Sequence, residues 1–529
     1  SLPWLVAAIA MSGIYIAKLR RADNGGASHI TFIVRKDGNT SDLFFQTSDT
    51  TWHAYNTYGG ANFYQGGANN RAYKLSYNRP FATRNSTDLN SPSGNTQRDF
   101  YFDSEYPTVR FLERNGYDVS YTTDVDTDRR GAELLKHKVF LSVGHDEYWS
   151  GAQRANMEAA RNAGVSFAFL TGNEGYWRTR WEASADGSNT SYRTLVSYKE
   201  TWANAKIDPD TQWTGTSRDP RFATPAQGAR NPENALSGTM YMVNDIDLPL
   251  RVGSDEGKLR IWRNTGLSAL AAGKTADLGD GILGYETNED VDNGFRPPGL
   301  IRMSTTVAST TQYLRDYGNV VAAGTTEHHI TLSRAASGAL VFSAATIRWG
   351  WGLDDVHDGR QGTSDSRIQQ ATVNVLADMG AQPSTLMAGL AAATKSTDTT
   401  APTTTITSPT QGQAIANGTA VTVTGTASDA AGRVAAALGP RQARLALIRT
   451  DLGIVRAATD FESGQRTSHR RRQFGRTQPL HQNLAVAVDH RRNRIRQHDT
   501  RIAQQTAPVP GVVAAVTQPD GQPNPAMYL

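Results

Sequence analysis

The stretch Val139–Tyr176 constrains the fold of this chain more than any other part of its sequence. It opens with Val139–Val143, a short apolar run with the length and β-branched character of a buried strand. Gly144 breaks the run, and three consecutive ionisable residues, His145–Glu147, follow it directly. A buried strand that ends in charged side chains is typical of an α/β protein whose ligands bind at one edge of its sheet.

A helix and a second strand complete this stretch. Ser150 and Gln153 have the spacing of a capping box, which predicts a helix that begins there and ends before Gly164. The run Val165–Leu170 is the second predicted strand, and the polar segment Thr171–Glu174 follows it. We expect the helix to bury a face of small residues: Ala152, Ala155, Ala159, Ala160 and Ala163.

The segment before this unit also alternates helices and strands. Ser104 is the predicted N-cap of a helix that ends at Gly116. A strand over Tyr117–Tyr121 and a helix over Thr127–His137 follow. Strands that alternate with short helices favour a parallel sheet with right-handed crossovers. Two leucines of the second helix are expected to be buried, Leu134 and Leu135.

Strands predominate on both sides of this segment. The aromatic and glycine-rich segment Thr51–Gly67 is interpreted as a shaped loop, and Thr363–Gly380 has the apolar spacing of an amphipathic helix packed on the sheet. The predicted fold class is therefore α/β, with a parallel-sheet core and extensive added β-strands. The added strands are predicted at Ser12–Leu19, Ile30–Arg35, Leu43–Thr47, Gly281–Tyr285, Ile330–Leu332 and Ala339–Phe342.

The composition excludes several classes of protein. The 529 residues include no Cys, so thiol nucleophiles, thiolate metal sites and disulfides are excluded. No apolar stretch reaches the roughly 18 residues that a membrane-spanning helix needs, and we expect no membrane partner. The apolar segment Leu2–Ile9 is short and has no basic residues before it, so we do not expect it to be a complete signal peptide.

The charge is divided unevenly along the chain. From Arg433 to Leu529 there are 15 Arg, no Lys and 6 acidic residues, a net charge of +9. Because the whole chain carries +4, the first 432 residues carry −5. They lack the basic field of a nucleic-acid-binding protein, and we expect no nucleic-acid partner.

The composition also changes near residue 396 and divides the chain into regions. Residues 1–395 form the predicted α/β domain, and residues 396–410 are a Thr/Pro-rich linker. Residues 411–432 have the pattern of the first strands of a bacterial immunoglobulin-like module. Residues 433–529 are an Arg-rich tail expected to have no compact fold, and two explanations of it stay open: translation in a wrong reading frame, or a natural disordered basic tail.

The ionisable cluster after the first strand is the strongest candidate for chemistry. His145, Asp146 and Glu147 lie before a helix N-terminus, whose partial positive charge stabilises anions, and the three residue types suit a metal or an acid–base site. The plainer alternative is that the two acids only favour the start of the helix. Asn173 and Glu174 end the neighbouring strand, so we expect them to line the same cleft.

Several motifs in the same order resemble the large (beta) subunit of N,N-dimethylformamidase, in its C-terminal catalytic domain family. The resemblance covers about residues 3–395, the predicted catalytic domain, and excludes the linker and the tail. Many members of this family are uncharacterised secreted bacterial proteins, some with immunoglobulin-like modules. The motifs are SGIYIAKL, SDTTWHAYN, VFLSVGHDEYWS, TGNEGYWR and NPENALSGTMY.

The resemblance implies a core similar to class I glutamine amidotransferases without their cysteine nucleophile. It also implies a mononuclear iron held by two tyrosines and one glutamate. Matched motif by motif, the iron ligands would be Tyr15, Tyr55 and Glu147, with Tyr58 and Tyr64 close to the second position. His145 would be an acid–base group and Glu286 the second catalytic carboxylate. No organic cofactor is expected.

This set is chemically coherent for hydrolysis of a linear amide of the formamide type. Phenolate and carboxylate oxygens suit a hard ferric ion, and three protein ligands leave positions open for water and substrate. A neighbouring His or Glu would take the proton from the water and hand one to the leaving amine. The expected partners are a small amide substrate and either a small partner subunit or a second copy of the chain.

Two other interpretations stay open. The chain is a secreted, non-catalytic surface or glycan-associated protein that keeps the fold, with the segment Thr51–Gly67 as a sugar-stacking surface. Alternatively, truncation and a frameshift have left it inactive. The linker and the immunoglobulin-like start favour a secreted or cell-surface bacterial protein. Convergence of the Tyr15, Tyr55 and Glu147 oxygens distinguishes catalysis from the surface role.

Overall fold

A computed structural model of the chain describes residues 10–81, 100–359, 362–397, 403–416, 424–428, 446–449, 454–458 and 513–517. Two compact units are distinguished, one of residues 1–398 with 512–529, and one of residues 399–511. Within the described residues, no helix is both long and apolar enough to cross a membrane.

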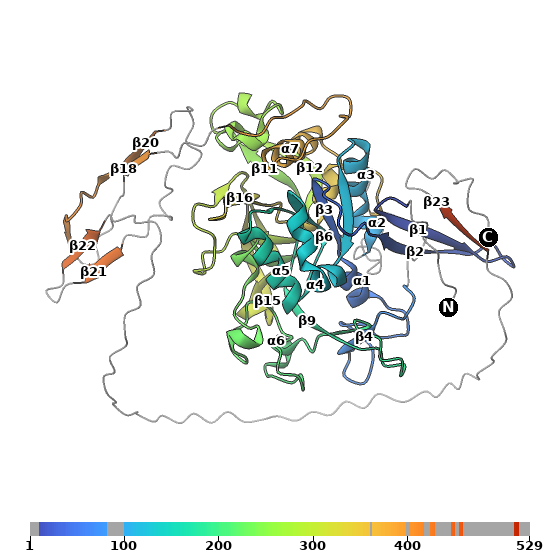
Figure 1. Cartoon of the computed structure of the whole chain (residues 1–529). Coiled ribbons are helices and arrows are strands. Elements are labelled where there is room, and N and C mark those ends of the chain that lie inside the picture. Colours follow the sequence, from blue (N-terminus) through green and yellow to red (C-terminus); the bar gives the residue numbers. More distant parts are fainter. Residues whose placement is uncertain are drawn as a thin grey trace, which may run out of the picture. The chain divides into compact units, whose positions relative to one another are not determined.

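The first unit is a mixed α/β structure built on a sheet with parallel strands (Figure 1). Strands β5, β3, β6, β8 and β17 are parallel neighbours in that order, and β16 and β13 extend the sheet antiparallel beside β17. This confirms the predicted strand–helix–strand unit and the α/β class. In sheet order the strands are β13 (Ile301–Arg302), β16 (Thr331–Arg334), β17 (Leu340–Ser343), β8 (Ser166–Gly172), β6 (Val139–His145), β3 (Leu43–Thr47) and β5 (Val119–Thr123).

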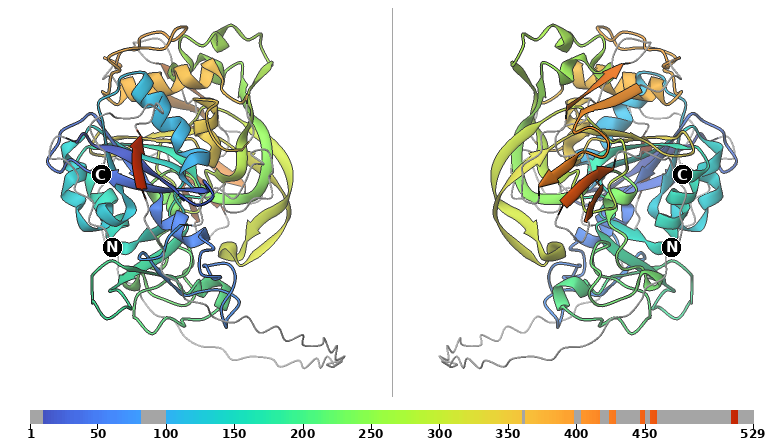
Figure 2. Two further views of the ribbon diagram at one scale, coloured as in Figure 1. Left: turned by 90° about the vertical axis from the view of Figure 1, so that its right-hand side faces the viewer. Right: turned by 90° about the vertical axis from the view of Figure 1, so that its left-hand side faces the viewer.

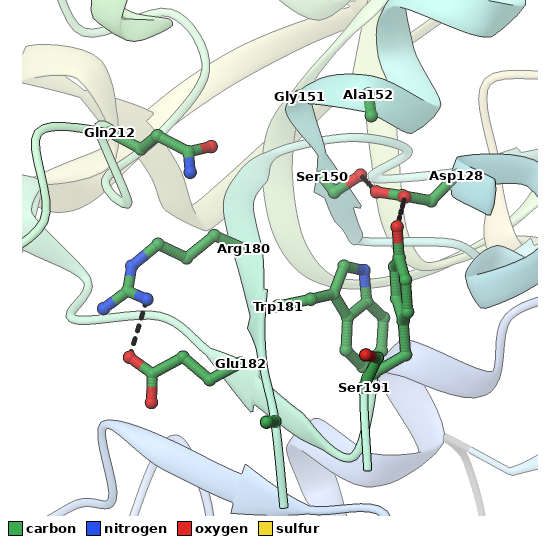
Figure 3. A pocket seen from close by; sticks show the side chains of 11 residues that line it. Asp128, Ser150, Gly151, Ala152, Arg180, Trp181, Glu182, Ser191 and Gln212 are labelled. Atoms are coloured by element: carbon green, nitrogen blue, oxygen red, sulfur yellow. Dashed lines mark hydrogen bonds and ion pairs between the residues drawn. The ribbon is translucent and has the colours of Figure 1, made fainter. Parts of the chain in front are cut away.

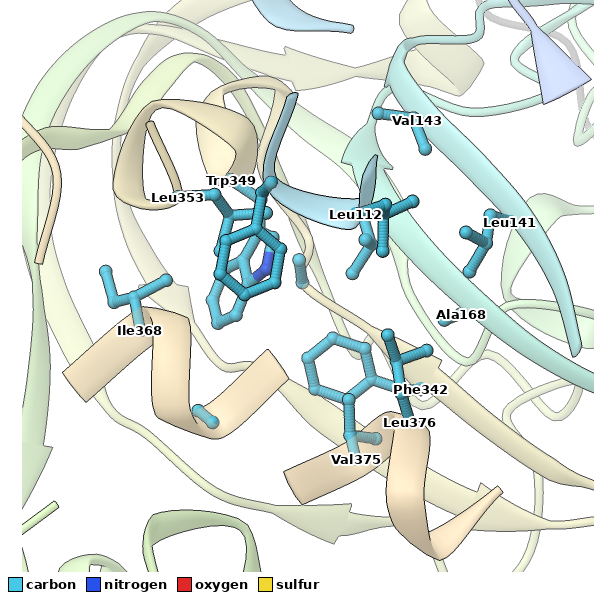
Figure 4. Packing of buried hydrophobic residues seen from close by; sticks show 14 of the residues in the cluster. Leu112, Leu141, Val143, Ala168, Phe342, Trp349, Leu353, Ile368, Val375 and Leu376 are labelled. Atoms are coloured by element: carbon cyan, nitrogen blue, oxygen red, sulfur yellow. The ribbon is translucent and has the colours of Figure 1, made fainter. Parts of the chain in front are cut away.

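The central strands β3, β6 and β8 are buried along their whole length, because helices cover both faces of the sheet. Leu141 of β6 packs on one face with α3, α7 and the 3₁₀ helix η8 (Figure 4). Phe140 points to the other face, where it packs with Met157 of α5. The helices are α1 (Asp49–Tyr55), α2 (Tyr101–Ser104), α3 (Tyr106–Arg114), α4 (Asp124–Arg129), α5 (Gly151–Asn162), α6 (Glu200–Ala203), α7 (Ser366–Asp378), η1 (Gly131–Lys136) and η8 (Ile347–Gly352).

Long antiparallel strands form a second sheet, which curves around one side of the unit (Figure 2). A third sheet consists of short strands. A hairpin of β1 and β2 pairs with β23 in a fourth. The second sheet has β11 (Met240–Gly253), β12 (Thr275–Glu289), β14 (Thr306–Arg315) and β15 (Val320–His328); the third has β4 (Lys74–Ser76), β7 (Tyr148–Ser150), β9 (Trp177–Glu182) and β10 (Thr194–Val196); the fourth has β1 (Gly13–Arg20), β2 (Ala27–Val34) and β23 (Val513–Thr517).

In the second unit the structure describes two small sheets. The predicted linker, immunoglobulin-like module and tail, residues 396–529, lie largely outside the described residues, and their assignment stays a prediction. The strands are β18 (Thr403–Ser408) paired with β20 (Thr424–Ser428), and β22 (Ile454–Ala458) between β19 (Ala414–Ala416) and β21 (Ala446–Arg449).

The helix boundaries confirm some local predictions and correct others. The capping box of Ser150 and Gln153 is present, and Gly164 has the positive φ of a helix C′ residue. Ser104, however, ends α2, and Glu105 is the N-cap of α3. Thr51–Gly67 is not entirely a loop, because its first residues belong to α1.

Two predictions of buried faces were right only in part. Helix α5 buries Gln153, Met157 and Ala160 at i, i+4 and i+7, whereas the other alanines of the predicted face are exposed. Small residues were expected to face the sheet, but the capping glutamine and Met157 fix the helix rotation instead. Leu134 is buried as predicted, but Leu135 is 55% exposed because 127–137 forms α4 and η1 rather than one helix.

Candidate active site

A cavity of about 520 Å³ lies at the carboxyl end of β6. Gly172, at the end of β8, lets β12 approach this edge, because a Cβ there would lie 2.9 Å from the Glu286 carbonyl oxygen. The cavity is lined by Tyr55, Thr57, Asn62, Tyr64, Gln65, Glu147, Tyr176, Trp177, Trp202, Tyr241, Asn244, Tyr285, Glu286, Leu314, Gly318, Asn319 and Val321.

Two phenol oxygens converge on the Glu147 carboxylate. The Tyr55 hydroxyl lies 2.9 Å from Glu147 Oε2, and the Tyr64 hydroxyl lies 2.9 Å from both carboxylate oxygens. The two hydroxyls are 2.7 Å apart. The backbone N–H of Glu147 donates to Thr51 Oγ1, which ties the end of β6 to α1, the helix that carries Tyr55.

A buried lysine lies behind this group. The Tyr148 hydroxyl donates to Tyr64 at 2.5 Å, and Lys199 Nζ donates to Tyr148 at 2.6 Å. Lys199 Nζ is also 3.8 Å from the ring centre of Trp177 and 4.6 Å from that of Trp202. Burial lowers the pKa of Lys199 well below its usual range, and the nearby charge of Glu147 opposes that shift.

His145 and Glu286 form a second pair beside Glu147. His145 Nε2 is 3.0 Å from Glu286 Oε2 and 3.4 Å from Glu147 Oε2. On the other side of the ring, the Tyr285 hydroxyl lies 2.9 Å from His145 Nδ1 and fixes the ring orientation. Tyr241 donates to Glu286 Oε1 at 3.0 Å. A proton can therefore move between the imidazole and either carboxylate.

Asn173 and Glu174, predicted to line the cleft, support this pair from behind. Asn173 Nδ2 donates to Glu286 Oε2 at 2.7 Å and lies 3.2 Å from His145 Nε2. Glu174 accepts from Asn288 Nδ2 at 2.7 Å, and burial raises the pKa of Glu174 to about 8. Both residues are buried and neither lines the cavity wall.

Burial sets the charge of the groups around the cavity. It raises the pKa of Tyr55 and Tyr64 well above the usual range, and the Glu147 carboxylate adds to that rise. Burial also raises the pKa of Glu147. For Glu286 burial acts in the same direction, but the charge of His145 and hydrogen bonds from His145, Asn173 and Tyr241 outweigh it, so its pKa is lowered.

Asp146, the middle residue of the predicted cluster, points away from the cavity. Its carboxylate accepts hydrogen bonds from Gln46 at 2.8 Å, Ser142 at 2.7 Å and the indole N–H of Trp149 at 2.9 Å. These three donors hold the buried carboxylate within the fold, and Asp146 is not among the residues that line the cavity. Asp146 therefore does not take the cleft-lining position expected from the sequence.

The structure does not bring Tyr15 to this site. Tyr15 is a β1 residue that stacks on Phe32, and its hydroxyl donates to the carbonyl of Met11. The second phenol beside Glu147 is Tyr64, which the motif comparison placed only near the Tyr55 position. The backbone N–H of Tyr64 donates to Asn62 Oδ1 and forms an Asx-type turn. Asn62 is the residue of the sequence that signals this turn.

A second pocket, of about 370 Å³, lies near the N-terminus of α5 (Figure 3). Its charged side chains already have partners: Asp128 accepts from the hydroxyls of Ser150 and Tyr192, and Arg180 pairs with Glu182. These groups are already satisfied, and none of the residues predicted for chemistry lines this pocket. The cavity at Glu147 is therefore the better candidate for catalysis.

The donor set at Glu147 fits an oxophilic metal ion. Oxygens 2.7–2.9 Å apart match neighbouring ligands at right angles around an ion with bonds of about 2.0 Å, since such ligands lie about 2.8 Å apart. Among the described residues, no group of three His, Asp or Glu side chains is arranged to hold a metal by itself. A metal at this edge would need the phenols.

The comparisons with known proteins agree with the motifs. None of the curated proteins matches the chain. A family model, N,N-dimethylformamidase beta subunit-like, C-terminal, matches residues 1–364 and so contains the whole of the site described above. Because the match covers more than half of the sequence, the chain belongs to the N,N-dimethylformamidase beta subunit-like family.

Proposed function

We propose that this protein is an iron-dependent hydrolase of linear amides. Family membership indicates a hydrolase of the amidase type. The observation that carries the proposal is the convergence of two phenol oxygens and a carboxylate within 2.9 Å of one another on the cavity wall. Tyr55, Tyr64 and Glu147 would hold the iron, with Tyr64 in place of the Tyr15 expected from the motifs.

The bound iron would supply electrophilic pull on the amide carbonyl and acidify water. The protein's own residues then handle the protons. The His145–Glu286 pair takes a proton from the attacking water and returns one to the departing nitrogen, so that the amide and water yield a carboxylic acid and an amine. The Tyr285 contact holds the imidazole in place for both transfers.

Because burial favours the neutral phenols, we expect Tyr55 and Tyr64 to lose their protons only when a cation binds beside them. In the absence of a cation, Tyr55 and Tyr64 keep their protons and donate to Glu147. A trivalent cation at the same point would favour the phenolate form by direct attraction. Binding of iron is therefore expected to release protons and to become tighter as pH rises.

Several further expectations belong to this proposal. They are the glutamine amidotransferase-like core, the immunoglobulin-like module, export to the cell surface, and a small partner subunit or a second copy of the chain. The convergence expected of Tyr15, Tyr55 and Glu147 is not met, because the Tyr15 hydroxyl lies on the Met11 carbonyl, and for that ligand set the non-catalytic alternative is favoured. The convergence of Tyr64 with Tyr55 and Glu147 is what supports catalysis.

The test uses the full chain, loaded with iron or stripped with a chelator. We expect about one iron per chain, visible absorption from phenolate-to-iron charge transfer, and release of amine from formamides by the loaded form alone. His145→Asn should retain the iron and its colour but lower kcat by about 10²–10⁴-fold. A protein that binds no iron, or that binds it and hydrolyses no amide, would contradict the proposal.

A further inference from the structure

The cavity is much larger than a formamide-type substrate. N,N-Dimethylformamide has five non-hydrogen atoms, and at about 30 Å³ for each water-sized group it would fill about 150 Å³ or less. The cavity measures about 520 Å³, within the range of pockets that bind drug-sized ligands. Most of the space is therefore left for a part of the substrate other than the amide group.

Much of the remaining wall is aromatic, and five uncharged polar residues also line the cavity: Thr57, Asn62, Gln65, Asn244 and Asn319. Tyr241 donates to Glu286, and its ring packs edge-to-face on Tyr176 with centres 5.1 Å apart. Trp177 lies next to Glu147, because its backbone N–H donates to the Glu147 carbonyl. The ring of Trp202 packs edge-to-face on the ring of Trp177, with centres 4.8 Å apart. These rings start beside the catalytic carboxylates and continue outward, so a substituent would leave the amide directly along them.

The β14–β15 strand pair adds two apolar side chains to the lining. Leu314 of β14 is paired with Val321 of β15, and both line the cavity. Leu314 is buried, whereas Val321 is 51% exposed. No Lys or Arg is among the described residues that line the cavity, and its charged side chains are Glu147 and Glu286. An anionic substituent would therefore meet the two carboxylates on the cavity wall, whereas the Lys199 ammonium lies against the Trp177 and Trp202 rings and does not line the cavity.

We infer that the substrate is an amide with one bulky, uncharged, aromatic or branched apolar substituent, rather than a small formamide. The inference rests on the proposed amide hydrolysis and adds the substrate class. Burial of a phenyl-sized group on this wall raises kcat/KM by about 10- to 100-fold over the small amide. The amide stays at the carboxylates, and the substituent lies between the rings and the β14–β15 pair.

The first experiment compares kcat/KM of the iron-loaded protein for N,N-dimethylformamide, N-benzylformamide and phenylacetamide. The last two place the same bulk on the amine side or on the acyl side of the amide. Preference for either bulky amide by at least 10-fold is the expected result, and the preferred one identifies the side that faces the aromatic wall. Equal or better use of N,N-dimethylformamide would overturn the inference and leave amide hydrolysis established.

A pair of neighbouring valines locates the selectivity. Val321→Phe fills the mouth and should lower the ratio of kcat/KM for the bulky amide to that for N,N-dimethylformamide by at least 10-fold. Val320→Phe is the matched control, because Val320 is 45% exposed on the same strand and does not line the cavity, and this variant should leave the ratio unchanged. If Val321→Phe and Val320→Phe give the same ratio of kcat/KM values, the inference is overturned.

Calorimetry separates the two proposals if no amide is hydrolysed. In that case hydrolysis is rejected, and the cavity is judged by binding alone. N-Benzylformamide that binds at least 10-fold more tightly than N,N-dimethylformamide, with the advantage lost in Val321→Phe, would show that the wall selects bulk. Equal affinities would overturn the inference as well.

Discussion

Two groups of buried acids lie on either side of the carboxyl end of β6, and they differ in what their oxygens meet. The site cluster (Tyr55, Tyr64, His145, Glu147 and Glu286) meets other ionisable groups and the cavity. The aspartate cluster (Asp49, Asp124 and Asp146) meets donors from the fold: Asp49 accepts from the Asp124 N–H and from Tyr77, and Asp124 accepts from Thr50 and Gln153.

The difference teaches that burial of an acid does not by itself indicate catalysis. Burial raises the pKa of Glu147 and of all three aspartates. What separates the clusters is the cavity: donors of the fold, the Tyr77 phenol among them, hold the aspartates away from it, whereas Glu147 lines the cavity together with two phenols. Asp146 and Glu147 are adjacent in sequence and take opposite roles because the chain directs their side chains to different sides.

The largest expected contrast is between these two neighbours. Glu147→Gln removes the carboxylate at the centre of the site cluster, and we expect loss of iron and a decrease of about 10³-fold or more in amide hydrolysis. Asp146→Asn should instead retain the iron and lower the free energy of unfolding by about 1–3 kcal/mol, because an amide N–H₂ would face existing donors. Metal content and urea unfolding of both variants test this, and iron loss in Asp146→Asn alone would reverse the assignment.

The pH dependence of stability distinguishes the aspartate cluster. Burial raises the pKa of Asp49 to about 7, whereas an unfolded Asp titrates near 3.9, so the folded chain binds the extra proton between these values. The contribution of this proton to the free energy of unfolding is complete below about pH 4. It is lost as pH rises to about 7, a decrease of up to about 4 kcal/mol.

As the pH rises from 4 to 8, the urea midpoint of Asp49→Asn should therefore increase relative to the urea midpoint of the wild type. The amide oxygen can still accept from the Asp124 N–H, and the amide N–H₂ would donate to the Tyr77 oxygen, whose hydroxyl donates to Asp49 in the wild type. A difference between variant and wild type that is constant over this range would exclude the proton linkage.

A smaller effect decides between the two tyrosines suggested for the iron. Tyr64→Phe should lower iron affinity by about 10- to 100-fold and weaken the phenolate absorption, since its oxygen contacts Glu147. Tyr15→Phe is the matched control and should leave both unchanged, because its hydroxyl contacts only the Met11 carbonyl among the described residues. Loss of iron from Tyr15→Phe with full binding in Tyr64→Phe would restore the ligand set implied by the motifs.

The smallest expected effect concerns one donor to the aspartate cluster. Ser142→Ala removes the hydroxyl that donates to Asp146, which keeps its bonds from Gln46 and Trp149. We expect a loss of about 1 kcal/mol in the free energy of unfolding and unchanged iron affinity. Equilibrium urea unfolding and iron titration check this, and a drop in iron affinity would mean that the two clusters are not independent.

The sequence predicted the elements whose signals are local. The apolar runs of β6 and β8 and the capping box of α5 were identified because each depends on a few adjacent residues. The direction of a face was harder to predict: the alanines of the predicted face other than Ala160 point outward, because Gln153 and Met157 contact the aspartate cluster and the sheet. Such choices depend on distant partners that no local pattern encodes.

Prediction of the candidate site was limited in the same way: local signals were found, and contacts with distant residues were not. Residues 145–147 were located from the strand end, but the separate directions of Asp146 and Glu147 follow from contacts with Gln46 of β3 and Thr51 of α1, about 100 positions away. Tyr64 comes to Glu147 through the turn at Asn62, and Lys199 through the α6 start, where its backbone takes a positive φ. Motif order alone could not rank Tyr64 above Tyr15.

The Lys199 amine has consequences for how the cavity responds to a guest. Four rings, those of Trp177, Tyr64, Trp202 and Tyr148, have their centres 3.8–4.8 Å from Nζ, so each ring holds the position of the next. A lining immobilised in this way gives up little conformational entropy when it is filled. Affinity at this place should then follow the shape of the guest closely, and a guest of the wrong outline should gain little from any adjustment of the protein.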